Sequence, residues 1–149
     1  MTTQKHETKN YIKQFLCPEQ TKLLSYYINK EVKWEDDKNK IQTYSKYSKF
    51  GCSINNTYEF PLWAVMVSKK LYYEKAIDFV PDEVTVFEQT NDTICDIKSI
   101  INEAKSNSVV IILEVSNSSL VSPGNLIVPS FFIDKCEDKV KALLFKKTR

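Results

Sequence analysis

The side chains that most often perform catalysis are few in this sequence and lie far apart. The single histidine, His6, belongs to the polar stretch 1–10, which is expected to be a disordered tail. The four cysteines form no CxxC pair and are Cys17, Cys52, Cys95 and Cys136. A Cys–His or Ser–His–Asp site would therefore have to recruit a histidine from the tail. We expect no catalytic residue, and the chain is predicted not to be an enzyme.

Metal and phosphate sites are also not favoured by the spacing of their usual ligands. The acidic group Glu35–Asp37 lies between two predicted strands, where a solvated hairpin turn is commoner than a divalent-cation site. Evenly spread cysteines in a reducing compartment are expected to be free and packed, and not to bind zinc. The two glycines, Gly51 and Gly124, are too few for a phosphate-binding loop. We therefore expect no metal site and no cofactor.

The length and composition are those of one globular domain, or of two very small ones that share a core. Hydrophobic residues make up 42% of the 149 residues, aromatic residues 12% and charged residues 27%, which is enough apolar surface for a core. The net charge of +2 is too small to imply nucleic-acid binding by itself. The first residues lack the apolar core of a signal peptide, and the longest apolar run, Val109–Leu113, is too short to cross a bilayer. A soluble intracellular protein is expected.

The fold class predicted from the periodicity is α+β. Residues 11–90 are predicted to form a small β-rich module with a proline-initiated helix, followed by a helical region. The expected helices of this module are Cys17–Asn29, with Pro18 in its first turn, and Pro61–Leu71. The expected strands, in which apolar and polar residues alternate, are Glu31–Trp34, Lys40–Tyr44, 57–60 and 75–80.

Residues 91–149 are predicted to be mainly helical. The stretch 91–107 has isoleucines at helical spacing, and Asp92 or Thr93 could cap it. A second helix is expected over 129–147, with Pro129 in its first turn. Between them, residues 109–115 are a possible strand, because β-branched residues favour one, although their periodicity is also compatible with a buried helix.

Several motifs of residues 15–84 occur in a recognisable order. A proline-initiated helix is followed by a glutamate-led strand at Glu31–Trp34 and by a loop that contains Phe50. The segment Glu59–Trp63 then reads Glu-Phe-Pro-Leu-Trp, and a proline-acidic turn follows at Val80–Glu83. This ordered set resembles the amino-terminal half of the second Psf subunit of GINS, a four-subunit replication factor of eukaryotes.

The resemblance implies a non-catalytic subunit that docks on other proteins. Its partners would be the other GINS subunits and the MCM-containing replicative helicase, within a nuclear hetero-oligomer. Contact with nucleic acid would be indirect or weak, and no contact with a membrane is implied. The residues that match the family's motifs, and that are implied to lie at the protein interface, are Phe50, Glu59, Pro61, Leu62 and Trp63. In the family, a helical domain follows this region. The helices expected after residue 91 would correspond to that domain.

Two other functions are compatible with the same residues. The first is a stand-alone α+β interaction adaptor, encoded by a host or by a virus. The second is a small domain that binds single-stranded nucleic acid, with lysines on phosphates and tyrosines stacked on bases. The residues that would serve this second function are Lys46, Lys49, Lys69, Lys70, Tyr44, Tyr47, Tyr72 and Tyr73. Trp63 could belong to the core or to a partner interface, and we predict that it belongs to the core.

Overall fold

The computed structural model describes residues 13–34, 40–46, 57–90, 107–116, 121–129 and 139–148. Its elements, in chain order, are β1 (Lys13–Gln14), α2 (Pro18–Glu31), β2 (Ile41–Ser45), β3 (Thr57–Glu59), α3 (Leu62–Tyr73), β4 (Glu83–Gln89), β5 (Ser108–Val115), β6 (Asn125–Ile127) and β7 (Val140–Lys146). The predicted α+β class is confirmed. Among these residues, no helix is both long and apolar enough to cross a membrane.

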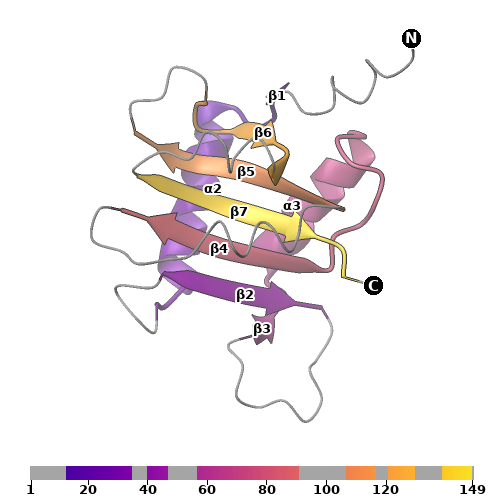
Figure 1. Ribbon diagram of the computed structural model, residues 1–149, viewed down its shortest axis with the longest axis horizontal. Helices are drawn as coiled ribbons and strands as arrows, with labels where there is room; N and C mark the ends of the chain where they lie inside the picture. The colour runs from indigo at the N-terminus through magenta and orange to yellow at the C-terminus, as the bar shows by residue number, and fades with distance from the viewer. Residues whose placement is uncertain are drawn as a thin grey trace.

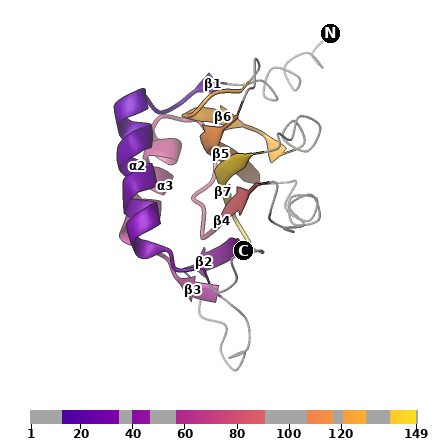
Figure 2. The ribbon, with the colours of Figure 1, turned by 90° about the vertical axis from the view of Figure 1, so that its left-hand side faces the viewer.

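The described strands form one seven-stranded sheet in the order β1-β6-β5-β7-β4-β2-β3 (Figure 1). Neighbouring strands are antiparallel except β2 and β3, which are parallel. Helices α2 and α3 lie on the same face of the sheet, as Figure 2 shows. The two edge strands are short, β1 with 2 residues and β3 with 3. Short edges offer few unpaired backbone groups to another chain, so edge-to-edge association through the sheet is disfavoured.

The sheet is buried on both faces at its centre. The face toward the helices packs with α2 and α3 in one core, and its sheet residues include Val109, Ile111, Leu143 and Phe145. The opposite face forms a second buried cluster, which includes Phe87, Val110, Ile112 and Leu144. A strand buried on both faces has apolar residues at consecutive positions, which explains the unbroken apolar runs of β5 and β7.

Helix α2 confirms the helix predicted at Cys17–Asn29. Cys17 is the N-cap, and its backbone N–H donates to Oε1 of Gln20 at 3.1 Å. The helix continues to Glu31, and the N–H of Val32 still donates to the carbonyl oxygen of Ile28 at 2.8 Å. The strand expected at Glu31–Trp34 is therefore wrong. Its alternation arises because Val32 and Trp34 both pack against the core under the helix end.

Helix α3 confirms the second proline-initiated helix. Pro61 is its N-cap, and the Pro61 carbonyl accepts the N–H groups of both Ala64 and Val65 at 3.0 Å. At the other end, the carbonyl of Leu71 accepts the N–H of Ala76 at 2.9 Å. The strand expected over 75–80 is wrong, because the backbone turns back on the helix end there instead of extending.

The described part of residues 91–149 is built from strands and not from the expected helices. The possible strand at 109–115 is confirmed as β5, whereas the helix expected over 129–147 is wrong from Val140 onward, where β7 begins. β7 lies between β4 and β5 at the centre of the sheet. Its apolar run was compatible with a helix because both of its faces are buried. The helix expected over 91–107 and the remainder of the second one lie outside the described residues, apart from Asn107, Pro129 and Lys139.

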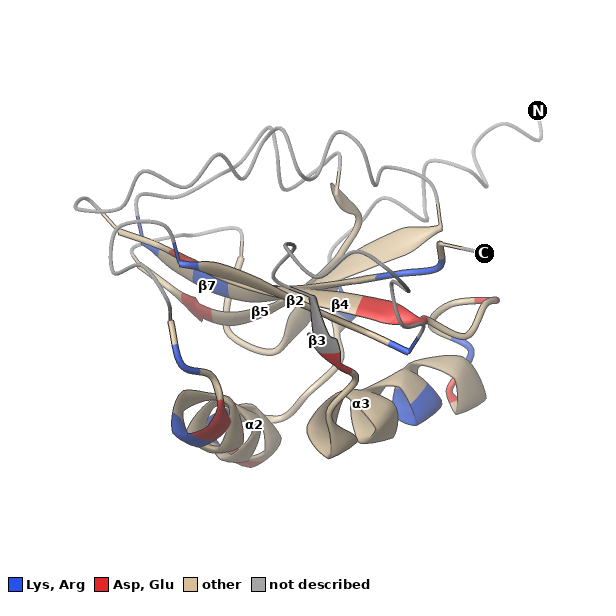
Figure 3. Cartoon of the chain, turned by 90° about the horizontal axis from the view of Figure 1, so that it is seen from below, with Lys and Arg blue, Asp and Glu red and all other residues tan. Residues whose placement is uncertain are grey.

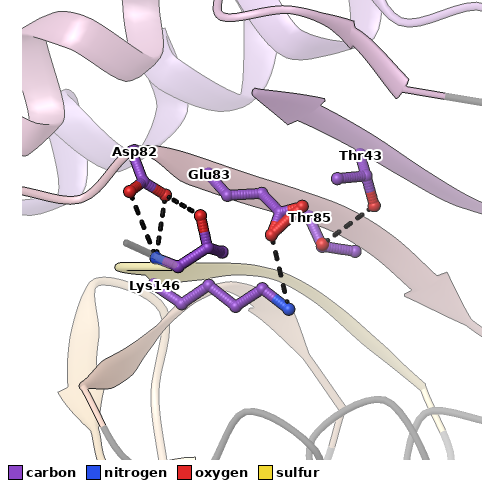
Figure 4. Close-up of polar contacts among 6 residues, drawn as sticks. Thr43, Asp82, Glu83, Thr85 and Lys146 are labelled. Carbon is purple, nitrogen blue, oxygen red and sulfur yellow. Dashed lines mark hydrogen bonds and ion pairs between the residues drawn. The ribbon is translucent and has the colours of Figure 1, made fainter. Parts of the chain in front are cut away.

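The carboxylate of Asp82 holds the chain after β7 against the start of β4 (Figure 4). It accepts the backbone N–H of Thr148 at 3.0 and 3.1 Å and the Thr148 hydroxyl at 2.9 Å. Glu83 of β4 and Lys146 of β7 are paired across the two strands next to this contact, and Nζ of Lys146 lies 3.4 Å from Oε1 of Glu83. Asp82 is 4% exposed, so its bonds to Thr148 replace the water that a buried carboxylate loses.

Candidate docking surface

The structure separates the five residues predicted to lie at an interface. Leu62 is 72% exposed at the start of α3, and Glu59 is exposed at the end of β3, whereas Pro61 is half-buried. Trp63 is only 6% exposed. Phe50 lies outside the described residues. Leu62 and Glu59 are therefore accessible to a partner, and Trp63 is not.

Trp63 packs inside the core between the helices and the sheet. Its ring meets the ring of Tyr44 edge-on, with 5.9 Å between centroids and 81° between planes. Burial raises the pKa of the Tyr44 hydroxyl, against the opposing effect of its hydrogen bond with Gln42. Within the described structure, the indole Nε1 of Trp63 is buried without a hydrogen-bond partner. Trp63 thus fixes α3 on β2 and leaves its neighbour Leu62 facing outward.

Five large apolar side chains project from the outward side of the two helices and form what we call the outer helical surface. They are Leu23 (56% exposed), Tyr26 (59%) and Tyr27 (44%) from α2, and Leu62 (72%) and Met66 (62%) from α3. The pairs Leu23–Tyr27 and Leu62–Met66 are each four residues apart, so each pair lies on one side of its helix. Both helices lie below the sheet in the view of Figure 3.

On α2 the sequence places Leu23, Leu24, Tyr27 and Ile28 in one apolar stripe, but the structure divides this stripe in two. Leu24 and Ile28 of α2 face the core, while Leu23 and Tyr27, one residue earlier, face outward. Two overlapping i, i+4 pairs offset by one residue span a wider arc than one buried face requires. This excess width is the signal in the sequence for an exposed apolar surface.

The charge around the outer helical surface is mixed. The first two turns of α3, Leu62–Ser68, contain no charged side chain, and Figure 3 shows them without blue or red. Lys70 and Glu74 form an ion pair at the far end of α3. On α2, Nζ of Lys30 lies 6.0 Å from the centroid of the Tyr26 ring. The α3 part of the surface is therefore uncharged over its first two turns and has charged side chains around it, as a protein-binding patch with a polar rim does.

A β-bulge brings a second set of polar side chains under α2. Ile112 of β5 pairs with Ala142 of β7, and the next pair is Glu114 with Lys141, so Leu113 is an extra residue. A bulge changes the alternation of side chains between the two faces of a sheet. Val109, Ile111 and Leu113 face the helix side by ordinary alternation, and the bulge turns Glu114 to the same side, where it reaches α2.

The side chain of Lys141 is the charged group most deeply buried in this region, at 3% exposure. Its Nζ donates to Oδ1 of Asn29 on α2, and Glu114 accepts the hydroxyl of Ser25 at 3.3 Å. Burial lowers the pKa of Lys141, while the carboxylates of Glu114 and Glu88 raise it less strongly. The cluster is a polar contact between α2 and the sheet. Burial of the Lys141 amine in this contact costs desolvation free energy.

We expect the stability of the protein to rise with pH above neutrality because of Lys141. Between its lowered pKa in the folded chain and the ordinary value of 10.5, the unfolded state binds more protons than the folded state. The groups that face the amine are Asn29, Glu114, Glu88 and Lys40. Urea unfolding of wild type and Lys141→Met, measured from neutral pH to about pH 10.5, should show a rise in the wild type that the variant lacks. Parallel profiles would contradict this, and Lys139→Met is the control for removal of an exposed lysine.

Comparison with known proteins gives no family for this chain. No family model matches it, and no curated protein matches it. Among the residues that the structure describes, no group of three or more His, Cys, Asp or Glu side chains is placed to hold a metal ion.

Proposed function

We propose that this chain is a non-catalytic subunit that docks on other proteins through the outer helical surface. One observation carries the proposal: seven large apolar side chains of the two adjacent helices are each more than 40% exposed, and five of them form this surface. Apolar side chains gathered on one face are typical of protein interaction sites, whereas single exposed ones are common everywhere. Two of the five are tyrosines and one is methionine, residue types that are enriched at interfaces.

The assembly that we propose is GINS, and through it the MCM-containing replicative helicase in the nucleus. The support for this choice is the ordered motif set in the sequence, above all Glu59–Trp63. The residues of this segment have different roles. Trp63 anchors α3 in the core, and this anchoring presents Leu62 and Met66 to a partner. Glu59, exposed beside the start of α3, supplies the polar rim.

The test is recovery of named partners with and without the surface. A tagged wild-type chain and the triple variant Leu23→Ser, Leu62→Ser, Met66→Ser are purified from cells that express the native protein, and bound proteins are identified by mass spectrometry. We expect GINS and MCM subunits with the wild type and at least a tenfold loss with the triple variant, because three central apolar anchors are worth roughly 1–2 kcal/mol each. The control is the double variant Lys22→Ser, Lys69→Ser, which changes exposed lysines on the same helices.

Two outcomes would contradict different parts of the proposal. Recovery without any GINS or MCM subunit would exclude the named assembly. Full recovery with the triple variant would exclude the outer helical surface as the docking site. Because the three residues are exposed, their replacement should change the free energy of unfolding by no more than about 0.5 kcal/mol each, so misfolding would be visible as a separate effect.

The stand-alone adaptor is distinguished by the behaviour of the isolated chain in solution. An obligate subunit leaves its apolar interface in water when its partners are absent, so it should self-associate as its concentration rises. Light scattering should show this for the wild type and much less of it for the triple variant. A stable monomer at high concentration would favour the adaptor instead.

A further inference from the structure

A groove of about 760 Å³ lies at the carboxyl end of α3. Five elements or connections contribute to it: β1, the end of α3, the connection 74–79, β5 and β6. The apolar residues that line it are Ala76, Ile77, Phe79, Val109, Leu126, Ile127 and Val128. Its volume lies within the range of cavities that hold drug-sized molecules, about 300–1,000 Å³.

The groove combines a buried apolar part with exposed cationic and aromatic groups. Val109 and Leu126 are at most 7% exposed and face the helix side of the sheet, so they form its floor. The exposed lining residues are Lys13, Tyr72, Tyr73, Lys75 and Asp78. Two lysines against one aspartate leave a net positive charge at the mouth. An apolar floor with a cationic mouth matches a molecule with an apolar body and one negative charge.

Lys75 occupies its position at a conformational cost. Its φ is +60°, in the left-handed region that glycine enters freely and that costs other residues about 1–2 kcal/mol. The backbone is held there by the bonds that end α3: the Lys75 N–H donates to the Tyr72 carbonyl at 3.0 Å, and the Ala76 N–H donates to the Leu71 carbonyl at 2.9 Å. Glycine is the usual residue at such a helix end. The chain has a cation at this point of the groove where backbone geometry favours glycine.

We propose that this groove binds a small amphipathic monoanion, with its apolar body on the floor and its acidic head paired with Lys13 and Lys75. Tyr72 and Tyr73 stand beside the head, with 5.8 Å between their ring centroids. Their rings cover apolar surface, and their hydroxyl groups can donate to a carboxylate. The site is independent of the outer helical surface, because none of the five residues of that surface lines the groove.

The first experiment uses dodecanoate, decanoate and dodecanol as probes, titrated into the full chain by calorimetry below their aggregation concentrations. Dodecanoate should bind on the order of tenfold more tightly than decanoate, because two further methylene groups leave water. Dodecanol, which has the same chain without the charge, should bind more weakly than dodecanoate, and added salt should reduce the difference. Equal affinity for dodecanol and dodecanoate, or no binding of dodecanoate, would overturn the proposal.

The second experiment uses Lys75→Gly, a variant for which two opposite effects are expected. Loss of the ammonium group should weaken dodecanoate roughly two- to fivefold and leave dodecanol unchanged. Removal of the left-handed strain should raise the melting temperature, so weaker binding could not be attributed to unfolding. Lys69→Gln, an exposed lysine of α3 that does not line the groove, is the control.

Unchanged dodecanoate affinity in Lys75→Gly would overturn the assignment of the head-group site. So would binding of a short oligothymidylate that is abolished by Tyr73→Ala and unaffected by dodecanoate, which would assign the tyrosines to single-stranded nucleic acid. Competition between dodecanoate and the oligonucleotide, with the fatty acid much the tighter ligand, would support the groove proposal. Neither result depends on the recovery of GINS subunits, so this inference and the proposed function can fail separately.

Discussion

Replacement of Trp63 by alanine is expected to lower the free energy of unfolding by about 3–5 kcal/mol, through lost burial and the cavity that remains. The indole is 6% exposed and meets Tyr44 edge-on, so the variant loses both apolar burial and an aromatic pair. Natural domains are stable by only about 5–15 kcal/mol, so this single change removes a large share of the total. Loss of partner binding should then follow from partial unfolding.

Urea unfolding of the isolated chain, measured beside partner recovery, tests this expectation. Leu62→Ala is the matched control, because Leu62 is the adjacent residue and is 72% exposed. It should change stability by about 0.5 kcal/mol or less while it weakens docking. Trp63→Phe should cost less than Trp63→Ala, since it keeps an aromatic ring and removes a buried N–H that has no partner in the described structure. An unchanged stability of Trp63→Ala with abolished binding would show that Trp63 is an interface anchor instead.

The two helices could be predicted because their starts are encoded locally. Pro18 occupies the first turn of α2, and Pro61 precedes the first turn of α3; both lack the N–H that those positions would leave unpaired. The ends were harder, because they depend on contacts beyond the helix. Val32 continues the hydrogen bonding of α2, and Lys75 ends α3 in a conformation that its residue type does not favour.

Strands were easiest to predict where one face differs from the other, whereas β5, which is buried on both faces, could be predicted only as one of two possibilities. β2 alternates, and its prediction at 40–44 is confirmed by Ile41–Ser45. β7 is central and buried on both faces, so apolar and polar residues do not alternate along it. Its apolar run is therefore equally compatible with a buried helix. The pairing of β7 with β4 and β5 joins segments more than 20 residues apart, a contact that no local pattern contains.

The candidate site could be predicted only in part, because contacts outside the local sequence decide which of its residues are exposed. Glu59–Trp63 could be selected from its motif, but the motif does not say which member points outward. That depends on the rotation of α3 against the sheet, which buries Trp63, Ala64 and Val67 and exposes Leu62 and Met66. The groove could not be predicted at all, because Lys13, Lys75 and Leu126 meet only in the folded chain.

The second large effect is expected at Gly124, where alanine should destabilise the protein by about 4 kcal/mol or more. Its φ of +91° is strained for any L-residue with a side chain. A Cβ atom at this position would lie 2.3 Å from the carbonyl oxygen of Leu16, 2.6 Å from Nε2 of Gln14 and 2.9 Å from Oγ1 of Thr21. The first of these is a backbone atom, so the clash cannot be relieved by a change of rotamer.

Gly124 is also the point at which the amino-terminal segment joins the sheet. Its carbonyl accepts the N–H groups of Phe15 and Leu16, both at 3.0 Å, and its own N–H donates to the carbonyl of Ile112 at 2.7 Å. A backbone shift that made room for Cβ would break these bonds and displace the connection between β1 and α2. Phe15 and Leu16 are buried, so their apolar surface would become exposed as well.

Chemical unfolding of Gly124→Ala measures this effect, and Lys75→Gly gives the comparison of opposite sign. Both positions have a positive φ, but one has glycine and the other has a side chain. If backbone conformation governs the stability change at both positions, removal of the side chain at 75 should stabilise the protein and addition of one at 124 should destabilise it. The effect at 124 should be far larger because of the contact with Leu16. A Gly124→Ala variant within about 1 kcal/mol of wild type would mean that the connection between β1 and α2 can move away without loss, so that the amino-terminal segment contributes little to the fold.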